Sequence, residues 1–201
     1  MRLGMIFECG PDGADMKVCE HLVKHLRPDA RIRSITLDNK PKLIAECGAV
    51  AAMLLREGCG NIIIVWDLYP AWRERGQSPC RADDRILIMD SLKTAGVRSR
   101  VHLVCIEEEL EAWLLADGRA ISCVLSTTAH PVRVKDVKNS ESVNNPKKRL
   151  NRLFTEKTGR PYNDIVHAEK IIRKLPDLNR IRRCSTFVRF AEKVTGTSFR
   201  G

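Results

Sequence analysis

An uninterrupted apolar run near the middle of the chain constrains the fold most strongly. The run extends from Asn61 to Trp66, consists mostly of β-branched residues, and ends directly at Asp67. A strand that is apolar on both faces has to be covered on both sides, which is typical of a central strand in a parallel sheet. The sequence therefore predicts an α/β fold in which helices cover both faces of this strand.

Strand and helix patterns alternate on either side of that run. Further strands are predicted at Leu3–Glu8, Ile32–Leu37 and Val101–Ile106. Between them, apolar residues at three- and four-residue spacing predict helices over residues 16–27, 43–57 and 81–95, and a fourth over residues 108–117. This alternation favours a mostly parallel, Rossmann-like sheet flanked by helices.

Positive charge is concentrated in the last third of the chain. Residues 1–129 contain 17 Lys or Arg and 18 Asp or Glu, a net charge of −1, whereas residues 130–201 contain 18 and 7, a net charge of +11. We therefore expect an α/β domain over residues 1–128 and a basic helical extension over residues 129–201 that packs on it. The extension has three short helical patterns, after a polar, irregular stretch from Ala129 to Asn145 that we expect to be flexible or to order on binding.

Neither a membrane span nor a leader is indicated. The apolar runs are far shorter than the roughly 20 residues that a membrane helix needs, so we expect a cytoplasmic protein. The eight cysteines are scattered singly without a CxxC pair, which favours reduced, buried thiols over a disulfide framework or a zinc site.

Acidic residues follow the predicted strands, at the edge where parallel sheets bind ligands. Glu8 ends the first strand, Asp67 follows the third and Glu107 the fourth. Asp12, in the glycine-containing turn after Glu8, is expected to point back to this edge, whereas Asp15 can cap the next helix instead. Carboxylates that meet at one edge repel each other unless a cation lies between them, and hard ions favour such oxygen ligands. The pattern predicts a divalent-metal site.

The order of Glu8, Asp12 and Asp67 along the chain resembles that of the Toprim domain of topoisomerases, primases and overcoming-lysogenization-defect nucleases. This resemblance implies a Toprim-like sheet. It also implies that Glu8 acts as a general acid/base, that the aspartates hold Mg²⁺ or Mn²⁺, and hence that Glu8 and Asp67 are catalytic.

A closer resemblance covers almost the whole chain. Its motifs are ELEAWLLAD at 109–117, NPKKRL at 145–150, Tyr162 with HA at 167–168, and STF at 185–187 with RF at 189–190. They are similar to an uncharacterised family of small Toprim-like proteins that are often encoded beside SMC/ABC-type ATPases in prokaryotic defence or mobile-element loci. The resemblance implies a role in phage defence with such an ATPase as partner.

The Toprim pattern is incomplete in this chain. Toprim domains usually have Asp-x-Asp after the third strand, but Tyr69 stands at the second position, where it does not replace a carboxylate at neutral pH. A second metal would need Glu107, Glu109 or Glu111. We favour Glu111, which belongs to the motif and would share a helical face with Glu107. Alternatively, these acids only line the first turn of a helix.

Basic residues cluster at the start of the first helical pattern of the extension, where they can neutralise the phosphates of DNA or RNA: Lys147, Lys148, Arg149 and Arg152. Few aromatic residues are interleaved with them, so base-specific reading is not indicated. A solvated surface, or one that meets an acidic protein, is the alternative. Trp66 and Trp72 flank the carboxylates and can stack on a base, although Trp66 is expected to pack in the sheet.

Three functions are open from the sequence. The leading one is a metal-dependent nuclease, or a related phosphoryl-transfer enzyme, acting on nucleic acid. The second is a non-catalytic subunit with a degenerate Toprim site that binds nucleic acid or an ATPase through the basic extension. The third is a small-molecule phosphohydrolase. It is the weaker reading because the chain contains no P-loop, nucleophilic serine elbow or dinucleotide glycine fingerprint.

Overall fold

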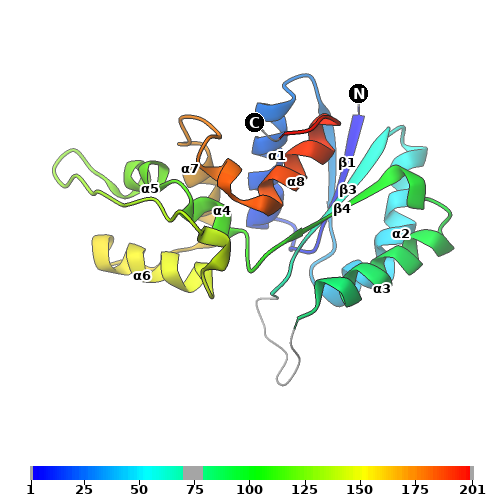
Figure 1. Ribbon diagram of the computed structural model, residues 1–201, viewed down its shortest axis with the longest axis horizontal. Helices are drawn as coiled ribbons and strands as arrows, with labels where there is room; N and C mark the ends of the chain where they lie inside the picture. The colour runs from blue at the N-terminus through cyan, green and yellow to red at the C-terminus, as the bar shows by residue number, and fades with distance from the viewer. Residues whose placement is uncertain (1, 70–78, 200–201) are drawn as a thin grey trace.

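Four parallel strands form the sheet at the centre of the protein (Figure 1). The computed structural model describes residues 2–69 and 79–199. The strands are β1 (Arg2–Phe7), β2 (Arg31–Thr36), β3 (Asn61–Asp67) and β4 (Val101–Ile106). Their order across the sheet is β2-β1-β3-β4, and each neighbouring pair is parallel. The predicted fold class, α/β with a parallel sheet flanked by helices, is confirmed.

Helices cover both faces of the sheet (Figure 1). On one face lie α2 (Lys40–Arg56) and α3 (Arg81–Thr94), and on the other lie α1 (Ala14–Leu26) and α8 (Ser185–Thr195). Beyond α1 and α8, further from the sheet, are the short helices α4 (Glu111–Leu115) and α5 (Gly118–Leu125), then α6 (Pro146–Thr158) and α7 (Asp164–Ile172). Single 3₁₀ turns lie at Arg98–Arg100, Ser140–Ser142 and Ile181–Arg183.

The alternation of side chains along β3 explains why its sequence is apolar throughout. Ile62, Ile64 and Trp66 pack with α2 and α3, whereas Ile63 and Val65 pack with α1 and α8. All five side chains are buried. Because successive residues of a strand point to opposite faces, the next residue on the α1 side after Val65 is Asp67.

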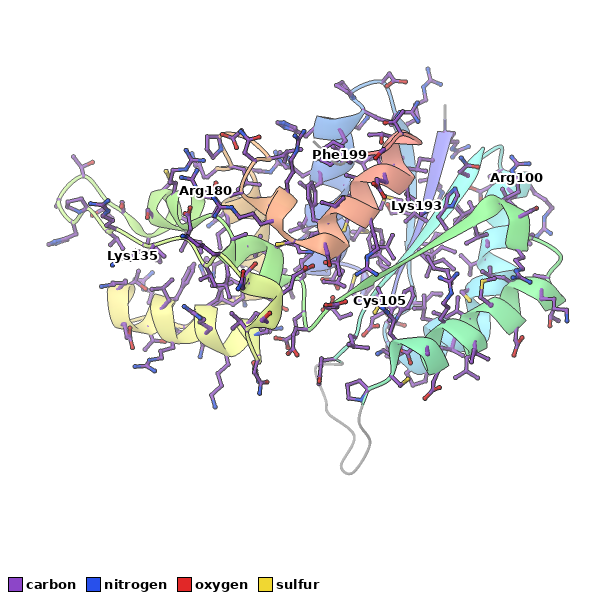
Figure 2. All side chains as sticks on the ribbon, in the orientation of Figure 1. Arg100, Cys105, Lys135, Arg180, Lys193 and Phe199 are labelled. Carbon is purple, nitrogen blue, oxygen red and sulfur yellow. The ribbon has the colours of Figure 1, made fainter. Side chains whose placement is uncertain are left out.

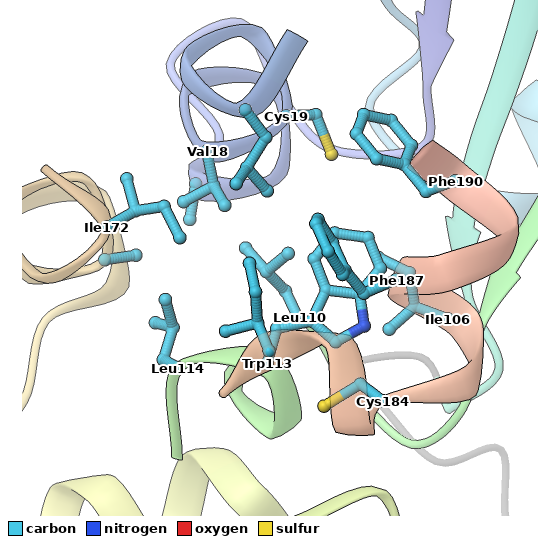
Figure 3. Packing of buried hydrophobic residues seen from close by; sticks show 14 of the residues in the cluster. Val18, Cys19, Ile106, Leu110, Trp113, Leu114, Ile172, Cys184, Phe187 and Phe190 are labelled. Atoms are coloured by element: carbon cyan, nitrogen blue, oxygen red, sulfur yellow. The ribbon is translucent and has the colours of Figure 1, made fainter. Parts of the chain in front are cut away.

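The basic extension shares the apolar core of the α1 side of the sheet. Trp113 of α4 is fully buried, with its ring centroid 5.6 Å from that of Phe187 and 5.7 Å from that of Phe190, both in α8 (Figure 3). The indole Nε1 of Trp113 also donates a hydrogen bond of 2.7 Å to Thr186 Oγ1. One cluster of buried residues therefore includes parts of both predicted domains, and the boundary at residue 128 stays a prediction.

The helix predicted over residues 108–117 is wrong in its bounds. Glu108 has a left-handed backbone with φ of 62°, so the chain turns there and α4 begins only at Glu111. Asp117 then ends the helical stretch and starts another, because its side chain caps α5 by accepting hydrogen bonds from the backbone amides of Arg119 and Ala120 at 2.9 and 3.2 Å. The sequence analysis did not predict α5.

The structure also bears on the expectations for the cysteines, the tryptophans and a membrane span. Five cysteines are buried, but Cys80 and Cys123 are exposed, so the expectation of buried thiols is wrong for these two. Trp66 is buried and its Nε1 donates to Asp84 Oδ2 at 3.1 Å, whereas Trp72 lies outside the described residues. Among the helices of residues 2–69 and 79–199, none is both long enough and apolar enough to cross a membrane.

The Trp113 ring joins α4 to α8, and its removal should therefore destabilise the protein. We expect Trp113→Ala to lower the free energy of unfolding by about 3–5 kcal/mol, the usual cost of deleting a buried aromatic side chain. Trp113→Phe keeps most of the ring but leaves Thr186 without its donor, and should cost about 1–3 kcal/mol. Urea unfolding followed by circular dichroism measures both values. Parent-like stability of Trp113→Ala would contradict a shared core.

Candidate functional site

A cleft of about 470 Å³ opens at the carboxyl ends of β1 and β3. Its walls are the turn after β1, the first turn of α1, the end of β3, the start of α4, and the first turns of α6 and α7. The described lining residues include one cation, Lys147, and eight carboxylates: Glu8, Asp12, Asp15, Asp38, Asp67, Glu109, Glu111 and Asp164. We call this feature the carboxylate cleft.

Glu8 and Asp67 lie side by side because β1 and β3 are neighbours in the sheet. Phe7 is in register with Val65, so the residues that follow them reach the same edge. Glu8 Oε2 and Asp67 Oδ1 are both buried, and neither has a hydrogen-bond partner in the described part of the chain. The other oxygen of Asp67 accepts a hydrogen bond from the Leu110 amide at 3.3 Å. A buried carboxylate oxygen without a partner is costly, so its presence points to a ligand.

Burial dominates the electrostatics of these two side chains. It raises the pKa of Glu8 from 4.5 to about 8, against the opposing charge of Lys40. Burial also raises the pKa of Asp67 well above its ordinary value, and the charges of Asp15 and Glu8 add to the effect. Both carboxyl groups are therefore able to hold a proton near neutral pH.

Glu111 reaches the same cleft from the start of α4. Only 4% of the residue is exposed, and its Oε1 accepts a hydrogen bond of 3.2 Å from the hydroxyl of Tyr162. Burial raises the pKa of Glu111 to about 8. Tyr162 is held in turn by Phe154 of α6, at 5.2 Å between ring centroids. Glu111 is thus positioned by an aromatic residue of the basic extension.

Lys147 neutralises one side of the cleft. Its Nζ lies 2.5 Å from Asp164 Oδ2, and its backbone amide donates to Glu109 Oε2 at 3.1 Å. Burial acts to raise the pKa of Asp164, but the hydrogen bond and charge of Lys147 outweigh it, so this pKa is lowered. Asp164 is therefore a paired carboxylate, unlike Glu8 and Asp67.

The sequence analysis expected Asp12 to point back to the sheet edge and Asp15 to cap α1, and the structure places both differently. Asp12 lines the outer part of the cleft, where its side chain is 83% exposed and lies 3.9 Å from Lys17. Asp15 does not cap α1, since Gly13 occupies that position. Instead Asp15 lines the cleft, and burial raises its pKa to about 6.

Of the two remaining residues that the sequence analysis considered, Tyr69 lines the cleft and Glu107 does not. Glu107 lies outside the cleft lining and pairs with Arg81 at 3.0 Å and with Arg189 at 3.4 Å. It does not share a helical face with Glu111, because the helix begins after the turn at Glu108. Tyr69 lines the cleft, and its backbone amide donates to the Glu108 carbonyl at 3.1 Å.

The four basic residues predicted to contact nucleic acid do not share one surface. Lys147 faces the carboxylate cleft, whereas Lys148, Arg149 and Arg152 line a separate groove beside it. The side chain of Arg152 is 82% exposed and pairs with Glu156 at 2.6 Å. The first turn of α6 thus separates the two features.

The four predicted metal ligands, Glu8, Asp12, Asp67 and Glu111, all line the carboxylate cleft. Within residues 2–69 and 79–199, however, no three Asp, Glu, His or Cys side chains are already close enough together to hold a metal ion. The donors are carboxylate oxygens, which suit Mg²⁺ or Mn²⁺. Two of these oxygens, on Glu8 and Asp67, have no partner among the described residues, so the donor chemistry fits such an ion, and the role of these residues as ligands stays a prediction.

Comparison with known proteins identifies one family. A profile described as "Domain of unknown function (DUF4276)" matches residues 19–195, which is most of the chain. No curated protein matches the sequence. No solved structure matches it either.

The raised pKa of Glu8 predicts how the stability of the metal-free protein depends on pH. Since the folded state holds the proton up to about pH 8 and the ordinary pKa is 4.5, the free energy of unfolding should fall as pH rises between these values. Glu8→Gln should make this fall smaller, by at least about 2–4 °C in Tm between pH 6 and 8.5, which is the effect of about 1 kcal/mol.

Thermal unfolding in EDTA measures this difference. Glu46→Gln, an exposed site on α2, is the matched control and should follow the parent protein. The same pH dependence in Glu8→Gln and the parent would contradict a buried, protonated Glu8.

Proposed function

Because this chain belongs to the DUF4276 family, whose description assigns no activity, we propose its function from the carboxylate cleft. We propose a metal-dependent nuclease, or a related phosphoryl-transfer enzyme, that acts on nucleic acid. The observation that supports this most directly is a pair of buried oxygens at neighbouring strand ends, on Glu8 and Asp67, that have no partner in residues 2–69 and 79–199. Carboxylate oxygens are the ligands that a hard divalent cation prefers, so two of them in one cleft suit such an ion.

Glu8, Asp67 and Glu111 would hold Mg²⁺ or Mn²⁺, with Asp12 at the open rim. When bound, such an ion would polarise a phosphoryl oxygen and lower the pKa of water. The Tyr162 hydroxyl would keep Glu111 in place through its hydrogen bond. Lys147, already paired with Asp164, would keep positive charge in the cleft.

Glu8 would also move the proton of the attacking water. A general base has to lie within hydrogen-bond reach of the water that it deprotonates, and Glu8 lines the cleft beside Asp67, the other central carboxylate. Its Oε2 has no hydrogen-bond partner among the described residues and is therefore available to accept a proton.

The resemblance of the sequence to Toprim domains supports the same proposal. The β2-β1-β3-β4 order and the carboxylates at the ends of β1 and β3 agree with a Toprim-like arrangement. A role in phage defence or mobile elements, and an SMC/ABC-type ATPase partner, rest on the resemblance of the sequence motifs alone.

Replacing either central carboxylate by its amide should abolish cleavage. We expect Glu8→Gln and Asp67→Asn to reduce Mg²⁺- or Mn²⁺-dependent cleavage of labelled DNA or RNA by at least about 10²–10³-fold, the loss typical when a group that stabilises the transition state is removed. Gel assays with and without EDTA measure this. Glu46→Gln is the control for the loss of one carboxylate.

Metal binding can be measured separately from cleavage. Mn²⁺ should raise the Tm of the parent protein, and this rise should be smaller in Glu8→Gln and Asp67→Asn. If both variants cleave as fast as the parent, the carboxylate cleft is not the active site.

A non-catalytic subunit is the alternative, and one observation favours it. Tyr69 stands in the cleft where Toprim domains usually have their second aspartate. In that case the protein would bind nucleic acid, or an ATPase, without turnover under any of the metal conditions above. Binding with no cleavage by the parent protein, alone or with an SMC/ABC-type ATPase, would support this alternative.

A further inference from the structure

A second groove lies next to the carboxylate cleft and has the opposite charge. Its volume is about 710 Å³. One wall is α6, with Lys148, Arg149 and Arg152, and the other is the extended segment 132–137, with Arg133 and Lys135. Glu156 is the one acid among the described lining residues, and it is paired with Arg152. We call this feature the basic groove.

The extended segment is anchored along its length, although it contains no regular helix or strand. The Val134 amide donates to Ser122 Oγ at 2.8 Å, and the Val137 amide donates to the Leu115 carbonyl at 3.1 Å. Gly118 brings α5 close to it, since a Cβ at this glycine would lie 2.5 Å from the Val134 carbonyl oxygen. The outer wall of the groove is therefore held by the backbone.

This anchoring directs the two cations outward. Val132 and Val134 pack against the core, while Arg133 and Lys135, which alternate with them, are exposed. Figure 2 shows Lys135 at one end of the molecule, over the extended segment, and Arg100 at the other. Neither Arg133 nor Lys135 was among the basic residues that the sequence pointed to.

The floor of the groove is apolar. It consists of aliphatic side chains from α4, the extended segment, the following loop and α6: Leu115, Val134, Val137, Val143 and Leu153. A duplex keeps its bases paired and presents mainly phosphates, whereas a single strand offers both phosphates and unpaired base faces. Cationic walls over an apolar floor suit the single strand. No aromatic side chain is among the described lining residues, so the bases would contact aliphatic side chains rather than stack on aromatic rings.

We propose that the basic groove binds single-stranded nucleic acid and that Arg133 and Lys135 are phosphate-binding residues. In combination with the proposed nuclease function, on which this part rests, the groove delivers the strand to the carboxylate cleft. Lys147 faces the cleft and Lys148 faces the groove. A strand that crosses the first turn of α6 therefore passes from one feature to the other.

Fluorescence anisotropy with the full chain in EDTA tests this binding. The probes are labelled oligo-dT, oligo-rU and a duplex, each of about 20 nucleotides or base pairs, which exceeds a typical single-strand site of about 4–16 nucleotides. The double variant Arg133→Ala/Lys135→Ala should bind the single strands at least about 10-fold more weakly near 0.1 M salt. Its slope of log K against log salt should be shallower by about 1.4, or 0.7 for each phosphate that is no longer neutralised.

The matched control removes two exposed cations at the other end of the sheet. Lys93 and Arg98 lie at the end of α3 and just before β4, far along the strands from the cleft. Lys93→Ala/Arg98→Ala should bind like the parent protein. Circular dichroism melts establish that both double variants are folded.

Four results would overturn the proposal. The first is equal affinity of Arg133→Ala/Lys135→Ala and the parent, and the second is equal weakening by the control. The third is tighter binding of the duplex than of either single strand. The fourth is displacement of the oligonucleotide by polyglutamate of equal charge as effectively as by unlabelled oligonucleotide, which would indicate a surface for acidic proteins.

The outcome is distinguishable from that of the nuclease proposal. Glu8→Gln and Asp67→Asn should retain or gain affinity for the single strand while losing cleavage. If these variants cleave normally but the Arg133/Lys135 variant binds weakly, the groove stands and the nuclease site falls. If the Arg133/Lys135 variant binds normally but Glu8→Gln loses cleavage, the nuclease site stands and the groove falls.

Discussion

Burial of β3 on both faces is the constraint on which the rest of the structure depends. Its side chains from Ile62 to Trp66 pack alternately against α2 and α3 and against α1 and α8, so this part of the strand has no polar side chain. Asp67 is the first carboxylate after that run and lies at the edge of the apolar layers, and one of its buried oxygens has no hydrogen-bond partner among the described residues. The same layers raise its pKa and that of Glu8. The hydrophobic core thus creates the chemistry of the cleft as well as the fold.

The sequence predicted the sheet and the meeting of Glu8 with Asp67, because both follow from local patterns. A continuous apolar run rich in β-branched residues identifies the central strand, and parallel strands end at one edge. Asp164 and Lys147 could not be placed in the cleft from the sequence, since their positions depend on how α6 and α7 pack on α1 and α4. The prediction that Glu107 and Glu111 share a helical face was wrong, because Glu108 has a left-handed backbone and the helix begins only after it. A glutamate gives no local signal of that conformation.

In the folded protein, the positive charge of the basic extension lies directly beside the acidic residues of the sheet domain. The basic extension does not stay apart from the acidic sheet domain, because α6 contributes Lys147 to the carboxylate cleft. The remaining cations of this helix face the other way, where they meet those of the anchored segment. Two regions of opposite potential therefore lie within one helical turn of each other. Such a boundary orients a bound polyanion, because one side attracts it and the other accepts it only with a cation.

The hydrogen bond between Tyr162 and Glu111 makes the basic extension and the sheet domain depend on each other. A phenol from the extension supports an acid that projects from the sheet side, and the Trp113 ring is enclosed by α8 in the same way. Neither part presents a complete set of partners without the other. Replacing the carboxy-terminal third by an unrelated sequence would therefore remove the partners of both side chains at once.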